Sequence, residues 1–214
     1  MMQLLLVPIC ALAVAGLLAA EKSQLLGLKY VCKPIASLAF VTLAMVNATK
    51  SGPLSPLELG LVIGLVLGAA GDVCLMLPGG RWFLAGLCSF LLGHLAYAAG
   101  FFSEAPPRPA LLWPAALGAL AGAALLKVLW TYVRGKRVAV VAYTSAIIAM
   151  VIAAWGVWQA GNPRGAWLFL AAAAFAASDV AVVRERFVKQ SFVNKAWGLP
   201  TYYAAQLLLA SAIG

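Results

Sequence analysis

Long apolar runs recur along this chain, and they restrict its fold more than any other feature of the sequence. A run of about 18 apolar residues or more is the length that an α-helix needs to cross a membrane. Of the residues, 64% are hydrophobic and only 10% are charged. A soluble domain could not wet its surface with so few polar side chains. The sequence therefore predicts an all-α integral membrane protein.

Turn residues and charges divide the apolar sequence into eight predicted transmembrane helices. We expect them over residues 3–20, 30–48, 57–77, 82–102, 110–132, 138–158, 165–183 and 196–213. One bundle of eight helices uses the whole chain, so we expect a single transmembrane domain over residues 1–214. The first run has no basic segment before it, and we interpret it as a retained helix rather than a signal peptide.

The basic residues separate onto two sides when eight membrane helices are assumed. Twelve of the 15 lie in or beside the first, third, fifth and seventh connections: Lys22, Lys29, Lys33, Arg81, Lys127, Arg134, Lys136, Arg137, Arg184, Arg186, Lys189 and Lys195. The other side has only Lys50, Arg108 and Arg164. Basic loops remain in the cytoplasm, so both termini are predicted to be non-cytoplasmic. We expect a multi-pass protein of the inner cell membrane, and the net charge of +9 does not indicate nucleic-acid binding.

A weak internal repeat relates the two halves of the sequence. Residues 69–73 read AAGDV and residues 176–180 read AASDV. The helices that follow contain HLAYAA at 94–99 and PTYYAAQ at 200–206. The pattern suggests a parallel 4+4 repeat, which in membrane proteins places a site at the interface of the halves. The sequence leaves open whether a duplication produced it.

Three glycines with four-residue spacing, Gly60, Gly64 and Gly68, lie along the third predicted helix. Small residues at this spacing form a ridge on which another helix can pack closely. We interpret this ridge as a packing feature.

Two aspartates, Asp72 and Asp179, lie near the ends of predicted membrane helices. A charge at the centre of a membrane helix costs about 2.5–3.5 kcal/mol on insertion scales. Two acids at matched depth therefore need a partner, a bound proton or water. We predict that they are the functional pair.

Other polar residues converge on the same side of the predicted membrane domain. By their distance from the helix ends, four of them lie at the depth of the aspartates: Lys33, Tyr143, Tyr202 and Tyr203. Gln206 lies deeper, and His94 and Tyr97 lie near the middle. This arrangement predicts a pocket open to the cytoplasmic leaflet. The alternatives are hydrogen bonds that only join helices, a lysine that reaches the interface, and a buried structural histidine.

Cysteine and histidine usage restricts the chemistry. Cys10, Cys32, Cys74 and Cys88 all lie in apolar runs and have no CxxC spacing. Structural disulfides and a zinc–thiolate site are therefore not expected. The chain has one histidine, which excludes a three-histidine zinc site. No metal site is predicted.

The ordered set of polar motifs resembles the YhhN family of membrane proteins, whose animal relatives are the lysoplasmalogenases. The resemblance rests on Lys33-Pro34, Gly71-Asp72, Gly93-His94-x-x-Tyr97, Ser178-Asp179 and Tyr203-x-x-Gln206. It covers the second to the eighth predicted helix. It implies hydrolysis of the vinyl ether bond of a lysoplasmalogen, without a cofactor, to a fatty aldehyde and glycerophosphoethanolamine or glycerophosphocholine.

The predicted aspartate pair suits this chemistry. A vinyl ether hydrolyses when an acid protonates its β-carbon and water traps the oxocarbenium ion, a division of labour like that of the paired carboxylates of glycosidases. We expect Asp72 and Asp179 to be acid and base, in an order that the sequence leaves open. Lys33 and Arg81 are expected to meet the substrate phosphate. The residues expected to orient substrate or water are His94, Tyr97, Tyr143, Tyr202, Tyr203 and Gln206.

Two other classes of function remain open at this stage. A proton-coupled transporter of a small molecule or lipid could use the same aspartates as a proton relay. Against it, the predicted polar groups crowd one leaflet. A purely structural role would leave function intact when both aspartates are changed to asparagine.

Overall fold

The protein is built from helices alone in the part that the computed structural model describes, residues 2–105, 107–133 and 135–214. The eight long helices are α1 (Met2–Ser23), α2 (Leu26–Ser51), α3 (Pro56–Met76), α4 (Gly80–Glu104), α5 (Leu112–Leu129), α6 (Arg137–Gln159), α7 (Gly165–Val183) and α8 (Phe192–Ser211). Two short helical segments are η1 (Pro109–Leu111) and η2 (Arg184–Val188). The all-α prediction is confirmed. Arg134, one of the basic residues counted above, lies outside the described residues.

Local sequence explains the limits of α3. Ser55 caps the helix: its hydroxyl accepts a hydrogen bond from the Glu58 N–H, and the Glu58 carboxylate accepts one from the Ser55 N–H at 2.9 Å. Pro56 follows at the first helical position, where a missing N–H costs nothing. After α3, Gly79 has a φ of 110°, a backbone conformation that favours glycine, and the chain turns directly into α4.

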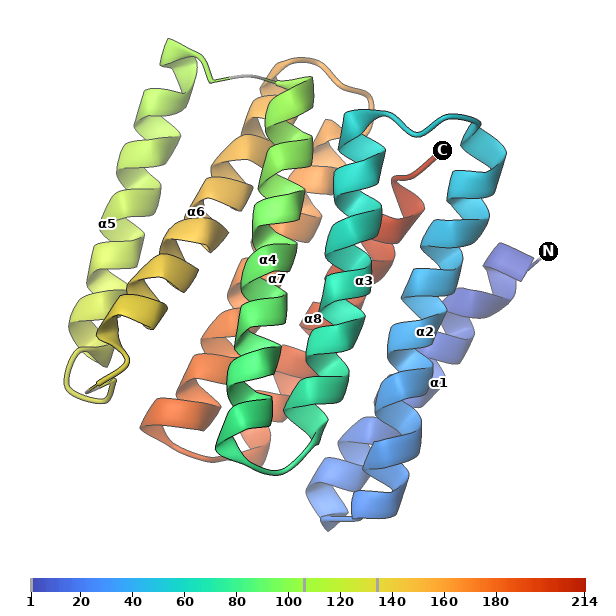
Figure 1. The fold of residues 1–214 in the computed structure, drawn as a ribbon, viewed down its shortest axis with the longest axis vertical. Coiled ribbons are helices and arrows are strands. Elements are labelled where there is room, and N and C mark those ends of the chain that lie inside the picture. Colours follow the sequence, from blue (N-terminus) through green and yellow to red (C-terminus); the bar gives the residue numbers. More distant parts are fainter. Residues whose placement is uncertain (1, 106, 134) are drawn as a thin grey trace.

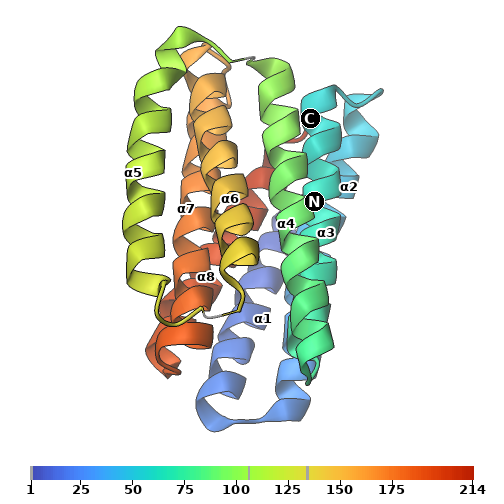
Figure 2. The same cartoon turned by 60° about the vertical axis from the view of Figure 1, so that its left-hand side comes forward.

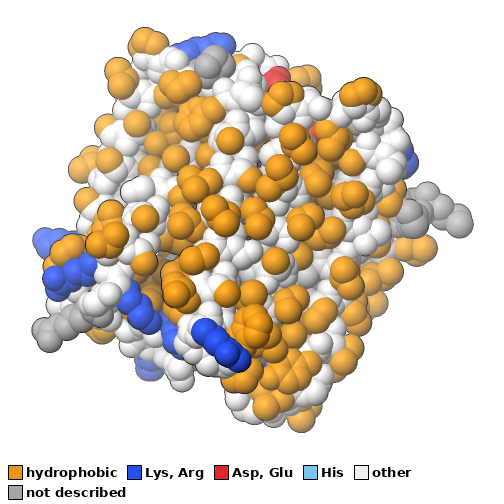
Figure 3. Space-filling view, in the orientation of Figure 1, with side chains coloured by type: hydrophobic (Ala, Val, Ile, Leu, Met, Phe, Trp, Pro, Cys, Tyr) orange, Lys and Arg blue, Asp and Glu red, His pale blue; other side chains and the backbone are white. Residues whose placement is uncertain are grey.

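The exterior of the bundle is apolar, as a lipid-facing surface must be. Many leucines, isoleucines and valines are exposed, and hydrophobic side chains cover the face shown in Figure 3. Seven helices of the described chain, α1 to α7, are long and apolar enough to span a membrane. The protein is therefore a multi-pass helical membrane protein. Eight spans remain a prediction, because α8, with Asn194, Lys195 and Gln206 among its residues, is not one of these seven.

The connections alternate between the two ends of the bundle. Figure 1 shows the α1–α2, α3–α4, α5–α6 and α7–α8 connections at the lower end, which we call the basic end. Lys and Arg side chains are concentrated toward this end in Figure 3. The alternation agrees with the predicted antiparallel order of neighbouring helices. The sidedness of the termini remains a prediction.

Six helices form a closed ring in the order α2, α3, α4, α6, α7 and α8, in which each contacts the next and α8 contacts α2. Outside the ring, α1 packs against α2 and α8, and α5 packs against α6. In both views α5 stands at one edge of the bundle (Figures 1 and 2). If α1 to α4 are exchanged with α5 to α8, each with its counterpart in the other half, the order of helices around the ring stays the same. The predicted 4+4 repeat requires such an order, and the repeat itself stays a prediction.

The glycine ridge on α3 is where the helices approach most closely. A Cβ atom at Gly64 would overlap the ring of Tyr97 on α4, and one at Gly68 would overlap the amide of Gln206 on α8. Gly60 faces the backbone of Gly100. The ridge thus makes room for two of the polar side chains that the sequence predicts to be functional.

Candidate active site

A cavity of about 570 Å³ opens inside the basic end of the bundle. All eight long helices contribute residues to its wall. Even α5, at the edge of the bundle, contributes Ala121, Gly122 and Leu125. Most of the lining is apolar, and the size falls within the range of small-molecule sites. Asp72 and Asp179 both line this cavity, together with Lys33, Tyr143 and Tyr202. The predicted convergence of these five residues is therefore present.

Asp72 on α3 lies among donors from two other helices. Its Oδ1 is 3.1 Å from the Nζ of Lys33 on α2, and the pair is buried. Its Oδ2 lies 2.7 Å from the hydroxyl of Ser37, which is one turn beyond Lys33. The hydroxyls of Tyr202 and Tyr203 on α8 lie 2.8 and 3.5 Å from the same oxygen. Both oxygens of the Asp72 carboxylate thus have donors nearby, and Lys33 adds a charge-assisted contact.

A directed chain of hydrogen bonds reaches Asp72 from α4. The Tyr97 hydroxyl donates to Oε1 of Gln206 at 2.9 Å. The Nε2 of Gln206 donates to the Tyr202 hydroxyl at 3.0 Å, and that hydroxyl donates to Asp72. Since Tyr202 has one hydroxyl proton and accepts from Gln206, its proton is free for the carboxylate. Tyr97 and Gln206 are fully buried and position Tyr202 from behind the cavity wall.

Asp179 on α7 has a different set of partners. Its Oδ2 lies 3.2 Å from Nε2 of His94 on α4, and its Oδ1 accepts a hydrogen bond from the Tyr143 hydroxyl at 3.4 Å. Neither His94 Nε2 nor Asp179 Oδ2 has a hydrogen-bond partner in the described chain, and their contact with each other lacks hydrogen-bond geometry. The His94 ring packs against Phe175, with 4.6 Å between the ring centroids, and against Tyr143.

The other nitrogen of His94 determines where protons can be in this pair. Its Nδ1 lies 2.6 Å from the carbonyl oxygen of Phe90, which can only accept, so Nδ1 carries a proton. A neutral ring then presents a lone pair to Asp179, which would repel an ionised carboxylate. The Nδ1-protonated tautomer follows from the hydrogen bond to Phe90. The 3.2 Å contact between His94 Nε2 and Asp179 Oδ2 is close but does not have the geometry of a hydrogen bond.

Aromatic rings lie between the two clusters. Phe175 contacts His94 on one side and Tyr202 on the other, at centroid distances of 4.6 and 5.3 Å. Phe90 also packs against Phe175 and Tyr202. In the described chain no hydrogen bond or ion pair joins Asp72 to Asp179. The two carboxylates thus share one cavity, and each has its own partners.

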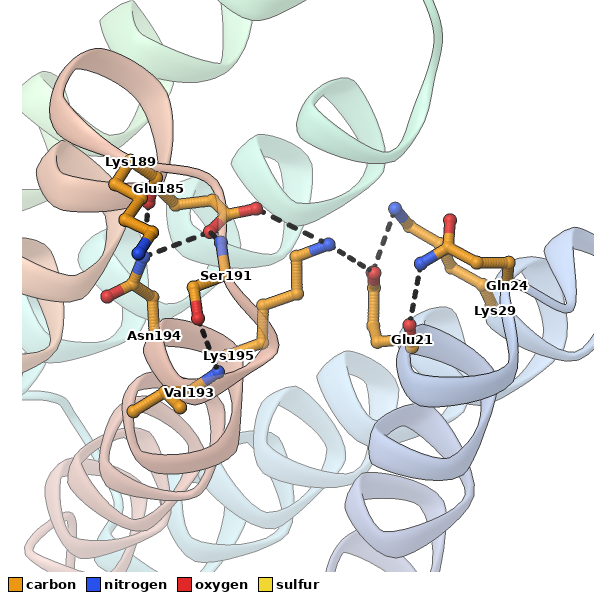
Figure 4. A network of polar contacts seen from close by, with 9 residues as sticks. All are labelled: Glu21, Gln24, Lys29, Glu185, Lys189, Ser191, Val193, Asn194 and Lys195. Carbon is orange, nitrogen blue, oxygen red and sulfur yellow. Dashed lines mark hydrogen bonds and ion pairs between the residues drawn. The ribbon is translucent and has the colours of Figure 1, made fainter.

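A network of ion pairs closes one side of the cavity mouth. Glu21 at the end of α1 is 2.9 Å from Lys29 and 2.7 Å from Lys195 at the start of α8. Lys195 also lies 3.5 Å from Glu185 of η2, whose other oxygen accepts hydrogen bonds from Ser191 and Asn194. Figure 4 shows the Lys195 side chain extending between the two glutamates. These contacts join the α1–α2 connection to the α7–α8 connection.

Arg81, which was expected at the substrate phosphate, lies away from the cavity and from both aspartates. Arg81 is exposed, and its guanidinium carbon lies 5.6 Å from the centroid of the Trp82 ring. Arg81 is absent from the cavity wall. Lys33 is at the cavity but is paired with Asp72 rather than free for a phosphate. From the sequence alone, both residues were expected at the phosphate because only their depth in the membrane could be judged. Tyr203, Tyr97, Gln206 and His94 lie behind the cavity wall.

Several residues of the site were not predicted. Ser37 lies one helical turn from Lys33, a spacing that places two side chains on one helix face. Glu21 and Glu185 were also missed. Together with the two aspartates they make four of the chain's six acids, and all four line the cavity. The sequence alone shows that these four acids lie near the basic end, and this concentration could have indicated that Glu21 and Glu185 belong to the site. In the described part of the chain, no three His, Cys, Asp or Glu side chains converge as metal ligands would.

Comparison with known proteins identifies relatives of this chain. It is 30% identical over 157 residues to lysoplasmalogenase TMEM86A of Bos taurus, and 29% identical over the same length to that of Homo sapiens. Both alignments cover 70% of this chain and 63% of the relative, so the chain spans less than two thirds of these proteins. It is 32% identical over 180 residues to lysoplasmalogenase TMEM86B of Mus musculus, covering 83% of this chain and 71% of that protein.

No solved structure matches the chain. The model of the YhhN family, however, matches residues 28–213, which include every residue of both aspartate clusters. The chain therefore belongs to the YhhN family.

Proposed function

We propose that this protein is a membrane lysoplasmalogenase, which hydrolyses the sn-1 vinyl ether of a lysoplasmalogen to a fatty aldehyde and glycerophosphoethanolamine or glycerophosphocholine. One observation carries the proposal: two aspartates line the same apolar cavity with different partners, Lys33 beside Asp72 and His94 beside Asp179. The names of the relatives support the substrate class. The protein acts within the inner cell membrane, from which the substrate reaches the cavity.

Asp179 and His94 hold the proton that starts the reaction. The 3.2 Å approach of Asp179 Oδ2 to His94 Nε2, with Nδ1 already bonded to the Phe90 carbonyl, supports this assignment. Transfer of this proton to the β-carbon of the vinyl ether turns the carbon–carbon double bond into an oxocarbenium ion. General acid catalysis of this kind contributes about 10²–10⁴ to the rate. Tyr143 holds the other oxygen of Asp179 and fixes its orientation.

Asp72 acts on the positively charged intermediate. In this mechanism it is the carboxylate held by Lys33 and the hydroxyls of Ser37 and Tyr202, and it stabilises the cation as it forms. The carboxylate also accepts a proton from the water that attacks the oxocarbenium carbon. The resulting hemiacetal collapses to the aldehyde and the glycerol hydroxyl, and the proton held by Asp72 returns to the Asp179–His94 pair. The net reaction consumes one water.

The cavity also accommodates the rest of the substrate. Its apolar wall, which includes Leu17, Leu75 and Ile148, suits an alkenyl chain. The charged mouth at the basic end suits a zwitterionic headgroup. Between them, the reacting bond lies near the aspartates, because only a glycerol unit separates it from the phosphate.

The test compares two substrates that differ in one bond. Purified protein is expected to release aldehyde from a lysoplasmalogen and none from the corresponding ester-linked lysophospholipid. In D₂O the aldehyde, trapped by reduction, is expected to carry one deuterium on the carbon next to the carbonyl. Equal cleavage of both lipids, or an aldehyde without deuterium, would contradict acid-catalysed vinyl ether hydrolysis.

Proton-coupled transport remains the rival from another class. It predicts uptake of a solute into proteoliposomes that is driven by a proton gradient, with no aldehyde released from lysoplasmalogen. The same purified protein serves both assays, so one preparation distinguishes the two functions.

A further inference from the structure

Two cations at the cavity mouth have no acidic partner. Lys136, next to the start of α6, and Arg186 of η2 both line the cavity. The other three cations of the lining, Lys29, Lys33 and Lys195, are each within 4.0 Å of a carboxylate. Among the described residues, no acid lies within that distance of Lys136 or Arg186. Among the described residues of the lining, these two, the cation pair, are therefore the positive charges without a carboxylate partner.

The cation pair is built around one aromatic ring. The guanidinium carbon of Arg186 lies 4.2 Å from the centroid of Phe83 at the start of α4, and the Lys136 Nζ lies 5.4 Å from it. Phe187 packs edge-on against Phe83, and Lys136 lies 5.9 Å from its centroid. Cation–π contacts stabilise each charge separately, but they also bring two like charges to the same ring. An anion between them would remove the repulsion.

We propose that the cation pair binds the phosphate of the lysolipid headgroup. The inference rests on the proposed function and adds the residues that recognise its substrate. A guanidinium can bind two phosphate oxygens at once, and a lysine adds a point charge from the other side. The pair lies at the mouth of the cavity that contains both aspartates. It takes the role that the sequence analysis assigned to Lys33 and Arg81.

The first measurement separates binding from chemistry. We compare wild type, Lys136→Gln, Arg186→Gln and the double variant, using a lysoplasmalogen and a 1-alkenylglycerol that has the same chain and no phosphate. Each single variant is expected to raise KM for the lysoplasmalogen about tenfold, the value of one charge-assisted hydrogen bond, with little change in kcat. For the alkenylglycerol, KM and kcat of every variant are expected to stay at the wild-type level, which would also demonstrate correct folding.

Arg81→Gln is the matched control, because Arg81 has the same charge at the same end of the bundle but lies outside the cavity. It is expected to leave both substrates unaffected. An unchanged KM for the lysoplasmalogen in the double variant, or an equal loss for the alkenylglycerol, would overturn the assignment. A rise in KM for the lysoplasmalogen in Arg81→Gln as large as that in Arg186→Gln would overturn it as well.

A binding arm keeps this inference separate from the proposed function. An ester-linked lysophosphatidylethanolamine, which is not expected to be cleaved, is titrated against the same variants. If wild type cleaves no vinyl ether but binds this lipid through the cation pair, the proposed function fails and the phosphate site stands. Inorganic phosphate and glycerophosphoethanolamine are tested as competitors. Stronger competition by inorganic phosphate would mean a general anion site and would overturn a headgroup site.

Discussion

Different partners distinguish the two aspartates. The Phe90 carbonyl requires a proton on Nδ1 of His94, and in the proposed mechanism the pair of His94 and Asp179 holds a second proton. Asp72, in contrast, accepts from Lys33 and from hydroxyls. Burial alone would favour the neutral form of both acids. In the proposed mechanism, their neighbours rather than their depth give them different roles.

His94→Gln tests the role of this proton. Glutamine is of similar size and keeps hydrogen-bonding atoms, but it cannot hold an ionisable proton for Asp179. We expect kcat for lysoplasmalogen to fall about 10²-fold or more, with KM changed little, because general acids contribute about 10²–10⁴. Steady-state aldehyde release measures it.

Ser89→Ala is the control for His94→Gln, because Ser89 lies on the same helix and donates only to the Leu67 carbonyl. It is expected to keep the wild-type kcat. A His94→Gln protein with near wild-type kcat would show that the reaction does not need this proton.

The residue types of the site were predictable from the sequence, but their pairing was not. Charges inside apolar runs identified Asp72, Asp179 and Lys33, since each needs compensation in a membrane. Depth along a helix does not say which helices are neighbours. Hence the sequence could not assign Lys33 to Asp72 and His94 to Asp179, and it placed Arg81 at the phosphate. Ser37 carries no charge, so it gave no comparable signal.

At the scale of elements, the α3–α4 pair and α8 hold the Asp72 cluster together. The glycine ridge of α3 brings α4 and α8 close enough for Tyr97 to reach Gln206 and for Gln206 to reach Tyr202. The spacing of the glycines predicted close packing. It did not predict that the space beside them would contain polar side chains of the site.

Gly64→Ala tests this link between packing and site. The added methyl group would meet the Tyr97 ring, and overpacking of this kind typically costs about 1–3 kcal/mol. We expect a lower unfolding temperature in detergent and a lower kcat, because displacement of Tyr97 breaks its bond to Gln206.

Gly27→Ala is the matched control, since nothing lies within 4 Å of a Cβ at that position. It should unfold at the wild-type temperature or slightly above, because alanine favours the helix. Equal stability of the two variants would contradict the close contact at Gly64.

On the scale of the whole molecule, the ring of six helices together with α1 and α5 forms the wall of the cavity at the basic end. Apolar runs and basic connections were enough to predict eight helices and their alternation, because each signal is local. The ring order depends on contacts between distant segments, such as α4 with α6 and α2 with α8, and no local pattern specifies them. The polar composition of α8 follows from its place in the ring, since its buried residues face the site rather than lipid.

The central claim is that Asp72 and Asp179 carry out vinyl ether hydrolysis together. The direct measurement is aldehyde release from lysoplasmalogen by Asp72→Asn and Asp179→Asn proteins, with Glu104→Gln at the opposite end of the bundle as control. We predict a loss of at least about 10²-fold in kcat for each aspartate variant, and wild-type turnover for the control. Near wild-type turnover in either folded aspartate variant would contradict the account.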